Sequence, residues 1–269
     1  IEMLDKWKGH LYNWYDIETL EVLRPYYVST VDSGNFISYL LLLKQGLEEY
    51  RNKTEGPDVI ENIIQRLDTI INNTEFIHLY DKNKNLFSIG YDVERETLTN
   101  SYYDLLASEA RTISYLTVAR REVPLKHWRK LGRALTCIGK NRVLVSWTGT
   151  MFEYFMPSLI MKNYKNTILY ETYQGVLKAQ KEYGRENNVP WGISESGYYT
   201  FDLNLNYQYK AFGVPALGLK RGLVEDIVVS PYSSMLALNF DPKGTVYNIR
   251  KLIELGMEGK YGLYEAVDF

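Results

Sequence analysis

Two glutamates lie in sequence surroundings that suit acid–base chemistry, and the first is Glu109. It falls four residues after Leu105 and four before Ile113, so on a helix it would lie in the middle of an apolar stripe. A carboxyl group there is costly to bury unless it is paired or faces a cavity, and burial raises its pKa, as a proton donor requires. The alternative is an internal salt bridge, for example with Arg111 or Arg120.

Glu195 is the second candidate. It lies between small residues in a glycine-rich stretch, with Trp191 before it and Tyr198 and Tyr199 after it. Small neighbours let a ligand approach the backbone closely, and aromatic rings provide faces on which sugars stack. The alternative is a solvated loop carboxylate.

Two further acids have strong structural alternatives. Glu153 follows Trp147 near the expected start of a helix, where a negative charge is favourable in its own right. Asp32 would serve as a helix N-cap. Carboxylates combined with aromatic residues nevertheless point to glycosidic bonds, because glycoside hydrolysis uses a pair of acids.

The composition excludes several other classes of function. The chain has 269 residues, with 31 basic and 33 acidic side chains and a net charge of −2, so it lacks the basic excess of a protein that binds nucleic acid through its phosphates. The single Cys137 excludes an internal disulfide framework and a cysteine-cluster metal site. The three histidines show no ligand spacing, and no glycine pattern of a phosphate-binding loop is present. We therefore predict no metal and no cofactor.

Tyrosine is unusually frequent. The chain has 24 Tyr, 9 Phe and 5 Trp, which together make 14% aromatic residues. Tyr and Trp combine a flat apolar face with a polar group, as binding of a sugar ring requires. The alternative is that most of these aromatic residues fill positions in the core. Composition by itself therefore favours a groove for carbohydrate or peptide but does not establish one.

The elements that must position these residues are mostly helical. Apolar periodicity, caps and breakers predict helices near residues 33–47, 57–72, 101–120, 124–131, 150–161, 167–186, 231–239 and 242–255. In the third of these helices, Ser101 and Asp104 would form a capping box. Residues 84–93 and 143–147 read as short extended runs. Residues 190–223 predict long ordered loops around at most one short helix.

We expect one domain over residues 1–269, mostly α, with its loops gathered on one side. The longest aliphatic run, residues 39–43, is too short to cross a bilayer. The residues at the start of the sequence do not resemble a signal peptide, and we expect the sequence to be a portion of a larger multidomain protein.

The sequence also resembles a known family through seven long motifs that occur in order along the chain. They are residues 10–16 (HLYNWYD), 27–35 (YVSTVDSGN), 102–111 (YYDLLASEAR), 146–154 (SWTGTMFEY), 190–196 (PWGISES), 212–222 (FGVPALGLKRG) and 261–266 (YGLYEA). Together they closely resemble the glucoamylase-like central domain of bacterial cyclic β-1,2-glucan synthases. That domain is the transglycosylating part of a large membrane enzyme and is related to endo-β-1,2-glucanases.

The resemblance implies an α/α toroid of the six-hairpin barrel type, with short β segments in its loops and a central groove for β-1,2-glucan. The family's domain continues past the last motif, so the toroid is expected to be incomplete in this sequence. The resemblance also implies a soluble domain on the cytoplasmic side of a membrane-anchored synthase. Its expected partners are β-1,2-glucan oligosaccharides or polysaccharides and the other domains of the parent synthase, and not nucleic acid.

Carried onto matching positions, the resemblance implies that Glu109 is the general acid/base and Glu195 the nucleophile of a retaining glycoside hydrolase or transglycosylase. This enzyme would cut linear β-1,2-glucan and cyclize it by joining the new end to the same chain. The two roles could be exchanged, or relayed through a sugar hydroxyl. The alternatives are a hydrolytic endo-β-1,2-glucanase and a non-catalytic glucan-binding segment. The residues expected to line the groove are Tyr15, Asp16, Asp32, Asn35, Trp147, Glu153, Trp191, Lys220, Arg221, Tyr264 and Glu265.

Overall fold

The computed structural model describes residues 1–51, 53 and 57–269, which form two compact units. Unit 1 comprises residues 1–104 and 110–131, and unit 2 comprises residues 105–109 and 132–269. Helices are the longest elements of both units, and the strands have two to six residues and pair antiparallel. The expected helical character with short β segments is therefore present.

Unit 1 combines helices with three small sheets, ordered β1-β2, β3-β6-β7 and β4-β5-β8. Its helices are α1 (Thr30–Arg51), α2 (Pro57–Asn72), the 3-10 helix η1 (Phe76–Leu79), α3 (Arg111–Ala119) and α4 (Lys126–Lys130). Its strands are β1 (Lys6–Trp7), β2 (His10–Leu11), β3 (Tyr27–Ser29), β4 (Tyr80–Asp81), β5 (Leu86–Ser88), β6 (Gly90–Asp92), β7 (Thr97–Leu98) and β8 (Tyr102–Tyr103).

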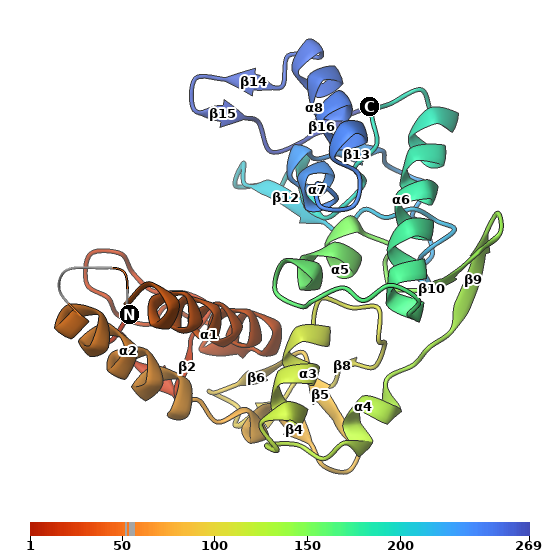
Figure 1. Cartoon of the computed structure of the whole chain (residues 1–269). Coiled ribbons are helices and arrows are strands. Elements are labelled where there is room, and N and C mark those ends of the chain that lie inside the picture. The colour runs from red at the N-terminus through yellow and green to blue at the C-terminus, as the bar shows by residue number, and fades with distance from the viewer. Residues whose placement is uncertain (52, 54–56) are drawn as a thin grey trace. The chain divides into compact units, whose positions relative to one another are not determined.

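The core of unit 1 lies between α1, α2, α3 and the strands. Helices α1 and α2 run side by side (Figure 1), and the predicted apolar stripe of α2 supplies the buried Leu67 and Ile71. Ile37 from α1 and Ile113 from α3 join the same cluster. Close approach of α1 to α3 requires Gly34, since a Cβ at that position would lie 2.5 Å from the Cβ of Ile113.

Helix α1 begins earlier than its sequence predicts. The Oγ of Ser29 accepts a hydrogen bond from the Asp32 N–H (3.3 Å), so Ser29 acts as the capping residue and Asp32 lies within the first turn. The interpretation of Asp32 as the N-cap is therefore wrong. Its carboxyl group is left exposed rather than used to cap the helix.

The expected helix over residues 101–120 is also wrong in its first half. Tyr102 and Tyr103 form β8, which pairs with β5, and the helix begins only at Arg111. Leu106 donates its N–H to the carbonyl of Gly132 (3.0 Å), far along the chain. These non-local backbone bonds override the local helical periodicity, because each satisfies a backbone group that the helix would otherwise have used.

Unit 2 is built around the long helix α6. Its helices are α5 (Met151–Phe155), the 3-10 helix η2 (Met156–Leu159), α6 (Ile168–Glu186), α7 (Pro231–Leu236) and α8 (Pro242–Glu254). Its strands are β9 (Leu135–Ile138), β10 (Asn141–Leu144), β11 (Ser196–Phe201), β12 (Tyr207–Lys210), β13 (Val228–Val229), β14 (Glu258–Gly259), β15 (Gly262–Leu263) and β16 (Val267–Asp268). The pairs are β9-β10, β11-β12, β13-β16 and β14-β15.

The four helices predicted in unit 2 are present with modest changes at their ends. The side chain of Thr167 accepts from the N–H of Tyr170 and caps α6, and Asp241 caps α8 in the same way through Gly244. Pro157 accompanies the change from α5 to the 3-10 turn η2. The expected loops over residues 190–223 contain instead the hairpin β11-β12.

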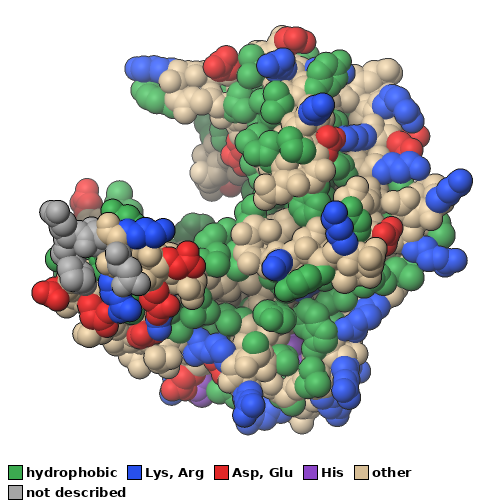
Figure 2. All heavy atoms as spheres, viewed as in Figure 1, with side chains coloured by type: hydrophobic (Ala, Val, Ile, Leu, Met, Phe, Trp, Pro, Cys, Tyr) green, Lys and Arg blue, Asp and Glu red, His purple; other side chains and the backbone are tan. Residues whose placement is uncertain are grey.

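Basic and acidic side chains are interspersed over the face shown in Figure 2, in keeping with the net charge of −2. Within the residues that the structure describes, no helix is both long and apolar enough to cross a membrane.

The α1–α3 contact predicts a difference between two glycines of the same helix. Gly34→Ala should destabilise the protein by about 1–3 kcal/mol, because the added methyl group overlaps Ile113. Gly46→Ala is the matched control, since no atom lies within 4 Å of its added Cβ, and it should be neutral or stabilise α1 by up to about 1 kcal/mol. Urea unfolding measures both changes. Equal stability of the two variants would contradict the described packing.

Candidate active site

The segment that carries Glu195 is held by one buried side-chain amide. Gln180 of α6 is fully buried; its Oε1 accepts from the N–H of Ile193 and its Nε2 donates to the carbonyl of the same residue, both at 2.9 Å. Met151, at the start of α5, donates its N–H to that carbonyl as well (3.2 Å). The amide of Gln180 therefore bonds Ile193 as a neighbouring strand would and fixes the backbone two residues before Glu195.

Gly192 is required where this segment passes α7. Its φ is +128°, and a Cβ there would lie 2.7 Å from the Oγ of Ser234 and 2.8 Å from the Oγ of Ser233. Only glycine adopts this conformation readily and leaves space for both hydroxyl groups. The Oγ of Ser233 donates to the Gly192 carbonyl (2.6 Å), so the close approach is also a hydrogen-bonded contact.

Two tyrosines hold Glu195 itself. The hydroxyl of Tyr232 donates to the backbone carbonyl of Glu195 (2.6 Å), and the hydroxyl of Tyr209 is hydrogen-bonded to the Glu195 carboxyl group. Desolvation of the hydroxyl and the charge of Glu195 raise the pKa of Tyr209, although the residue as a whole is 64% exposed. Tyr209 therefore stays protonated and donates to the carboxylate, which orients Glu195.

Glu109 lies in the short segment 105–109 of unit 2, not on a helix. The prediction that Glu109 lies on an apolar helical stripe is therefore wrong. The expected burial of its carboxyl group is present. The Oγ of Ser108 donates to its Oε2 (3.1 Å). Arg120, one of the two basic residues proposed as its salt-bridge partners, pairs instead with Glu122 (2.6 Å).

The electrostatic surroundings of Glu109 favour its protonated form. Burial is the largest cause, followed by the negative charge of Glu153 and then, after an opposing backbone hydrogen bond, that of Glu195. Together they raise the pKa of Glu109 from 4.5 to about 7. Near neutral pH the side chain therefore exists in both protonation states, as a group that donates and then recovers a proton must.

Glu153 organises the turn that leads into α5. Thr150 and Glu153 form a reciprocal capping box, and the carboxylate also accepts from Ser146 Oγ (2.7 Å) and from the N–H of Thr148 (3.1 Å). The residue is only 7% exposed. This geometry matches the structural alternative for Glu153, a negative charge that is favourable at the N-terminus of a helix. The same charge also raises the pKa of Glu109, which belongs to the same unit.

An aromatic cavity of about 670 Å³ lies in unit 2 beside the strand that follows Glu195. Tyr199, Tyr207 and Tyr264 line it, with exposures of 77%, 67% and 60%. Glu265 also lines it, and its Oε1 accepts from the N–H of Gly197 (2.7 Å). Exposed aromatic faces beside a held carboxylate can stack on sugar rings and bind their hydroxyl groups.

The remaining residues proposed to line a groove fall into both units. In unit 2, Trp147 is 60% exposed, and Lys220 and Arg221 are exposed. Trp191 is 7% exposed, and Asn248 bonds both its N–H (3.1 Å) and its carbonyl (2.6 Å). The backbone of Trp191 thus ties the Glu195 segment to α8.

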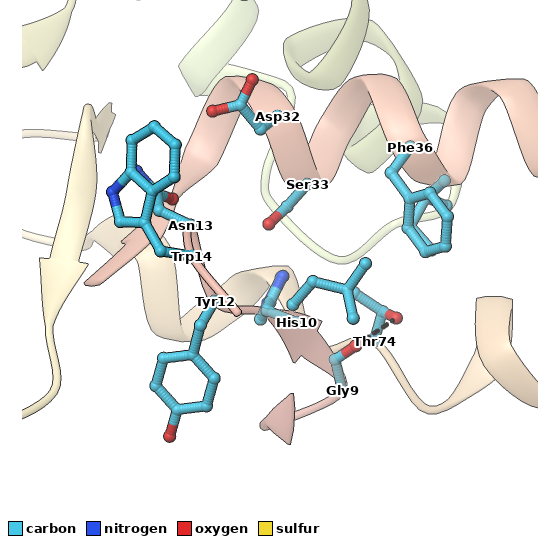
Figure 3. A pocket seen from close by; sticks show the side chains of 11 residues that line it. Gly9, His10, Tyr12, Asn13, Trp14, Asp32, Ser33, Phe36 and Thr74 are labelled. Carbon is cyan, nitrogen blue, oxygen red and sulfur yellow. Dashed lines mark hydrogen bonds between the residues drawn. The ribbon is translucent and has the colours of Figure 1, made fainter. Parts of the chain in front are cut away.

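Tyr15, Asp16, Asp32 and Asn35 belong to unit 1. The hydroxyl of Tyr15 accepts from the Tyr12 N–H (2.9 Å) and donates to the Asp5 carbonyl (2.6 Å). The Asp16 carboxylate accepts from two backbone N–H groups of the following turn. Both side chains thus hold their own loop together, whereas Asp32 lines a separate pocket (Figure 3).

Sequence reasoning missed Gln180, Tyr209 and Tyr232. Tyr209 lies in a run with alternating tyrosines, a pattern typical of a strand, and this signal could have indicated the hairpin. Gln180 and Tyr232 act through partners 13 and 37 residues away, which no local pattern indicates. Among the described residues, no group of three or more His, Cys, Asp or Glu side chains could hold a metal ion.

Comparisons with known proteins agree on one family. The sequence profile of the family described as "Putative glucoamylase" matches residues 101–269. In an alignment of 262 positions that covers 94% of the chain, the chain is 41% identical to the cyclic β-(1,2)-glucan synthase NdvB of Rhizobium meliloti (strain 1021). The chain spans only 9% of that synthase.

Two solved structures share the fold. One is the endo-β-1,2-glucanase of Talaromyces funiculosus in complex with sophorose, with a TM-score of 0.72 and 16% identity over 90% of this chain and 53% of that one. The other is a protein from Bacteroides uniformis described as a glucoamylase, with a TM-score of 0.73 and 14% identity over 98% of this chain and 66% of that one. The chain therefore spans about half to two thirds of these relatives in structure.

The raised pKa of Glu109 predicts how stability depends on pH. Between pH 4.5 and about 7 the unfolded chain has lost this proton while the native state retains it, so the Glu109 contribution to stability falls as pH rises. Glu109→Gln removes this penalty. It should match the parent protein at pH 4 and be more stable at pH 8, by on the order of 3 kcal/mol.

Glu171→Gln is the matched control, because it makes the same substitution at an exposed acid in the first turn of α6. Its free energy of unfolding should stay within about 0.5 kcal/mol of the parent value at each pH. Urea unfolding at pH 4, 6 and 8 measures both variants. A constant difference between Glu109→Gln and the parent across this range would refute the assigned protonation.

Proposed function

The chain belongs to the family of glucoamylase-like proteins, and we propose that it is a retaining glycoside hydrolase or transglycosylase acting on linear β-1,2-glucan. It cuts the glucan and joins the new end to the same chain, which releases a cyclic product. The observation that carries the proposal is that the buried carboxyl group of Glu109 belongs to the same unit as Glu195, whose carboxyl group is hydrogen-bonded to Tyr209. The charge of Glu195 is one of the causes that raise the pKa of Glu109. Identity to a cyclic β-1,2-glucan synthase supports the choice of substrate and acceptor.

In the proposed first step, the Glu195 carboxylate attacks the anomeric carbon and the glycosidic bond breaks. Glu109 donates its proton to the leaving oxygen, which departs as a hydroxyl group. A covalent glycosyl ester on Glu195 results. Tyr209, which donates to the Glu195 carboxylate, orients the nucleophile before attack.

In the second step, a hydroxyl group at the other end of the same glucan attacks the ester. Glu109, now a carboxylate, accepts the proton of that hydroxyl, and Glu195 is released as a carboxylate. Formation of the ester removes the negative charge of Glu195, one of the causes that raise the pKa of Glu109. The pKa of Glu109 is therefore lower while the ester exists, which favours the carboxylate form that acts as the base. The pKa rises again when the Glu195 carboxylate is released.

The aromatic cavity beside Glu195 supports the binding of glucan. Tyr199, Tyr207 and Tyr264 offer exposed ring faces, and Glu265 offers a carboxylate acceptor. Trp147, Lys220 and Arg221 are exposed in the same unit. We assign them to the glucan-binding groove of which this cavity forms a part. Exclusion of water by bound glucan would favour a sugar hydroxyl as the acceptor.

Hydrolysis is the second candidate, favoured by the fold shared with an endo-β-1,2-glucanase. In that case water replaces the sugar hydroxyl, and a carboxyl separation of about 6.5–9.5 Å would go with inversion, whereas about 5–5.5 Å goes with retention. A non-catalytic glucan-binding segment is the third candidate.

We also propose that residues 1–269 belong to one α/α toroid domain, a portion of a larger synthase whose other domains are its partners. The fold shared with the glucanase and the 9% share of the synthase support this view. A location on the cytoplasmic side of a membrane is part of the same proposal.

Product analysis by mass spectrometry tests the function. With linear β-1,2-glucan, the protein should form products that lack the mass of one water, as cyclization requires. Glu109→Gln and Glu195→Gln should each lower the rate by roughly 10²-fold or more, because each removes a reacting group. Glu171→Gln, an exposed acid in the first turn of α6, is the matched control and should retain the parent rate.

Linear products only would establish the glucanase alternative, and glucan binding without products would establish the binding segment. Parent activity in both Glu109→Gln and Glu195→Gln would contradict the assigned pair.

A further inference from the structure

The chain immediately before Glu195 contacts the first turn of α5 through two hydrogen bonds. Met151 donates its N–H to the carbonyl of Ile193 (3.2 Å), and Phe152 donates its N–H to the Oγ of Ser194 (3.1 Å). The first N–H groups of a helix have no acceptor within the helix itself. The segment that leads to Glu195 therefore supplies acceptors to α5, and both belong to unit 2.

The hydroxyl group of Ser194 also connects α5 to Glu195 through Tyr232. Ser194 is fully buried, and its Oγ lies 2.9 Å from the hydroxyl oxygen of Tyr232. Tyr232 has a single hydroxyl proton, and that proton is donated to the carbonyl of Glu195 (2.6 Å), which can only accept. The proton between the two hydroxyl groups is therefore that of Ser194.

The result is a chain of hydrogen bonds with one direction. It runs from the N–H of Phe152 to Ser194, from Ser194 to Tyr232, and from Tyr232 to the carbonyl of Glu195. Burial is the largest cause that raises the pKa of Tyr232, and the negative charges of Glu195 and Glu265 also raise it. Tyr232 therefore keeps the proton that completes the chain, and each bond of such a chain polarises the next.

Helix α5 is a suitable anchor for this chain because its first turn is itself fixed. Glu153, the residue after Phe152, forms the capping box with Thr150 and accepts from the Oγ of Ser146. The charge of Glu153 is also the larger of the two that raise the pKa of Glu109. One set of hydrogen bonds thus joins the helix whose charge acts on the proposed acid to the backbone of the proposed nucleophile.

We propose that Ser194 is a positioning residue for the nucleophile, which holds the peptide group of Glu195 against the first turn of α5 and acts through Tyr232. Ser194 is fully buried, so it contacts neither the glucan nor the reacting atoms. The proposal rests on the proposed function, because a fixed peptide group matters only if the Glu195 carboxylate has to meet one carbon atom at a defined angle.

A buried serine that only fills the interior would behave differently. Loss of its hydroxyl group would lower the stability of the fold, but the effect on the reaction would not depend on Tyr232. A positioning residue that acts through Tyr232 loses its effect once the Tyr232 hydroxyl is gone. The energetic coupling between the two hydroxyl groups therefore distinguishes the two roles.

Steady-state cleavage of linear β-1,2-glucan by the whole chain provides the first measurement. Ser194→Ala should lower kcat roughly tenfold and leave KM within about twofold of the parent value, because the nucleophile is misaligned while the glucan still binds. Circular dichroism at the assay temperature gives the folded fraction, to which each kcat is referred.

Ser196→Ala is the matched control for the loss of the serine hydroxyl. It makes the same substitution on the other side of Glu195, at a residue that is also buried. Among the described residues, the Oγ of Ser196 has no hydrogen-bond partner. This variant should keep the kcat of the parent.

A double-mutant cycle then tests the route through Tyr232. Tyr232→Phe should lower kcat by a factor similar to that of Ser194→Ala, and the double variant should be no slower than Tyr232→Phe alone. Tyr183→Phe, the same substitution at a half-buried tyrosine of α6, should keep the parent kcat. Parent kcat in Ser194→Ala, or a double variant slowed by the product of the two separate factors, would overturn the positioning role.

Carbon NMR of the Glu195 side-chain carboxyl group, recorded without glucan, separates this proposal from the proposed function. The resonance should move in Ser194→Ala and in Tyr232→Phe and stay in place in Ser196→Ala. An unmoved resonance in Ser194→Ala would overturn the positioning role at any level of activity. Absence of cleavage by the parent would overturn the proposed function; a resonance that still moves would then support the constraint on Glu195.

Discussion

The repulsion between negative charges in unit 2 is the constraint on which the proposed chemistry depends. Glu153 and Glu195 both raise the pKa of Glu109, and burial adds the largest contribution. Fixed protein groups stabilise the other two acids: Glu153 accepts from several donors of the turn before α5, and Glu195 receives the hydroxyl of Tyr209. Burial and the two neighbouring charges outweigh the hydrogen bonds that Glu109 accepts from Ser108 and from the backbone, so Glu109 is the acid that retains its proton.

Much of unit 2 serves to hold these charges in place. Gln180 bonds the strand before Glu195 at both its N–H and its carbonyl, and Tyr232 bonds the carbonyl of Glu195. Asn248 holds Trp191 four residues earlier. Like charges can be kept close only by a framework whose own polar groups are satisfied, since otherwise relaxation would separate them. A rigid framework of this kind also suits a reaction in which the nucleophile must meet one carbon atom.

Several features could be predicted from the sequence because they depend on neighbouring residues. The helices α2, α6 and α8 follow from their apolar stripes and caps, and the capping role of Glu153 follows from its spacing to Thr150. The acids Glu109 and Glu195 could be selected as candidates from their surroundings and from the family motifs. Their roles remain proposals.

Other features could not be predicted because they depend on distant partners. Residues 102–106 leave the helical pattern, since Tyr102 pairs with Ser88 and Leu106 bonds Gly132. The exposed position of the Asp32 carboxylate depends on Ser29 acting as the cap in its place. In both cases a partner outside the expected helix, a paired strand or the Ser29 hydroxyl, decides where the helix begins.

The most direct test of the acid pair is the titration of the Glu109 carboxyl group, followed by carbon NMR in the parent protein and in Glu195→Gln. The account predicts a midpoint of about 7 in the parent and a lower midpoint in Glu195→Gln, because one of the neighbouring negative charges is gone. A midpoint near the ordinary value of 4.5 that is the same in both proteins would contradict it.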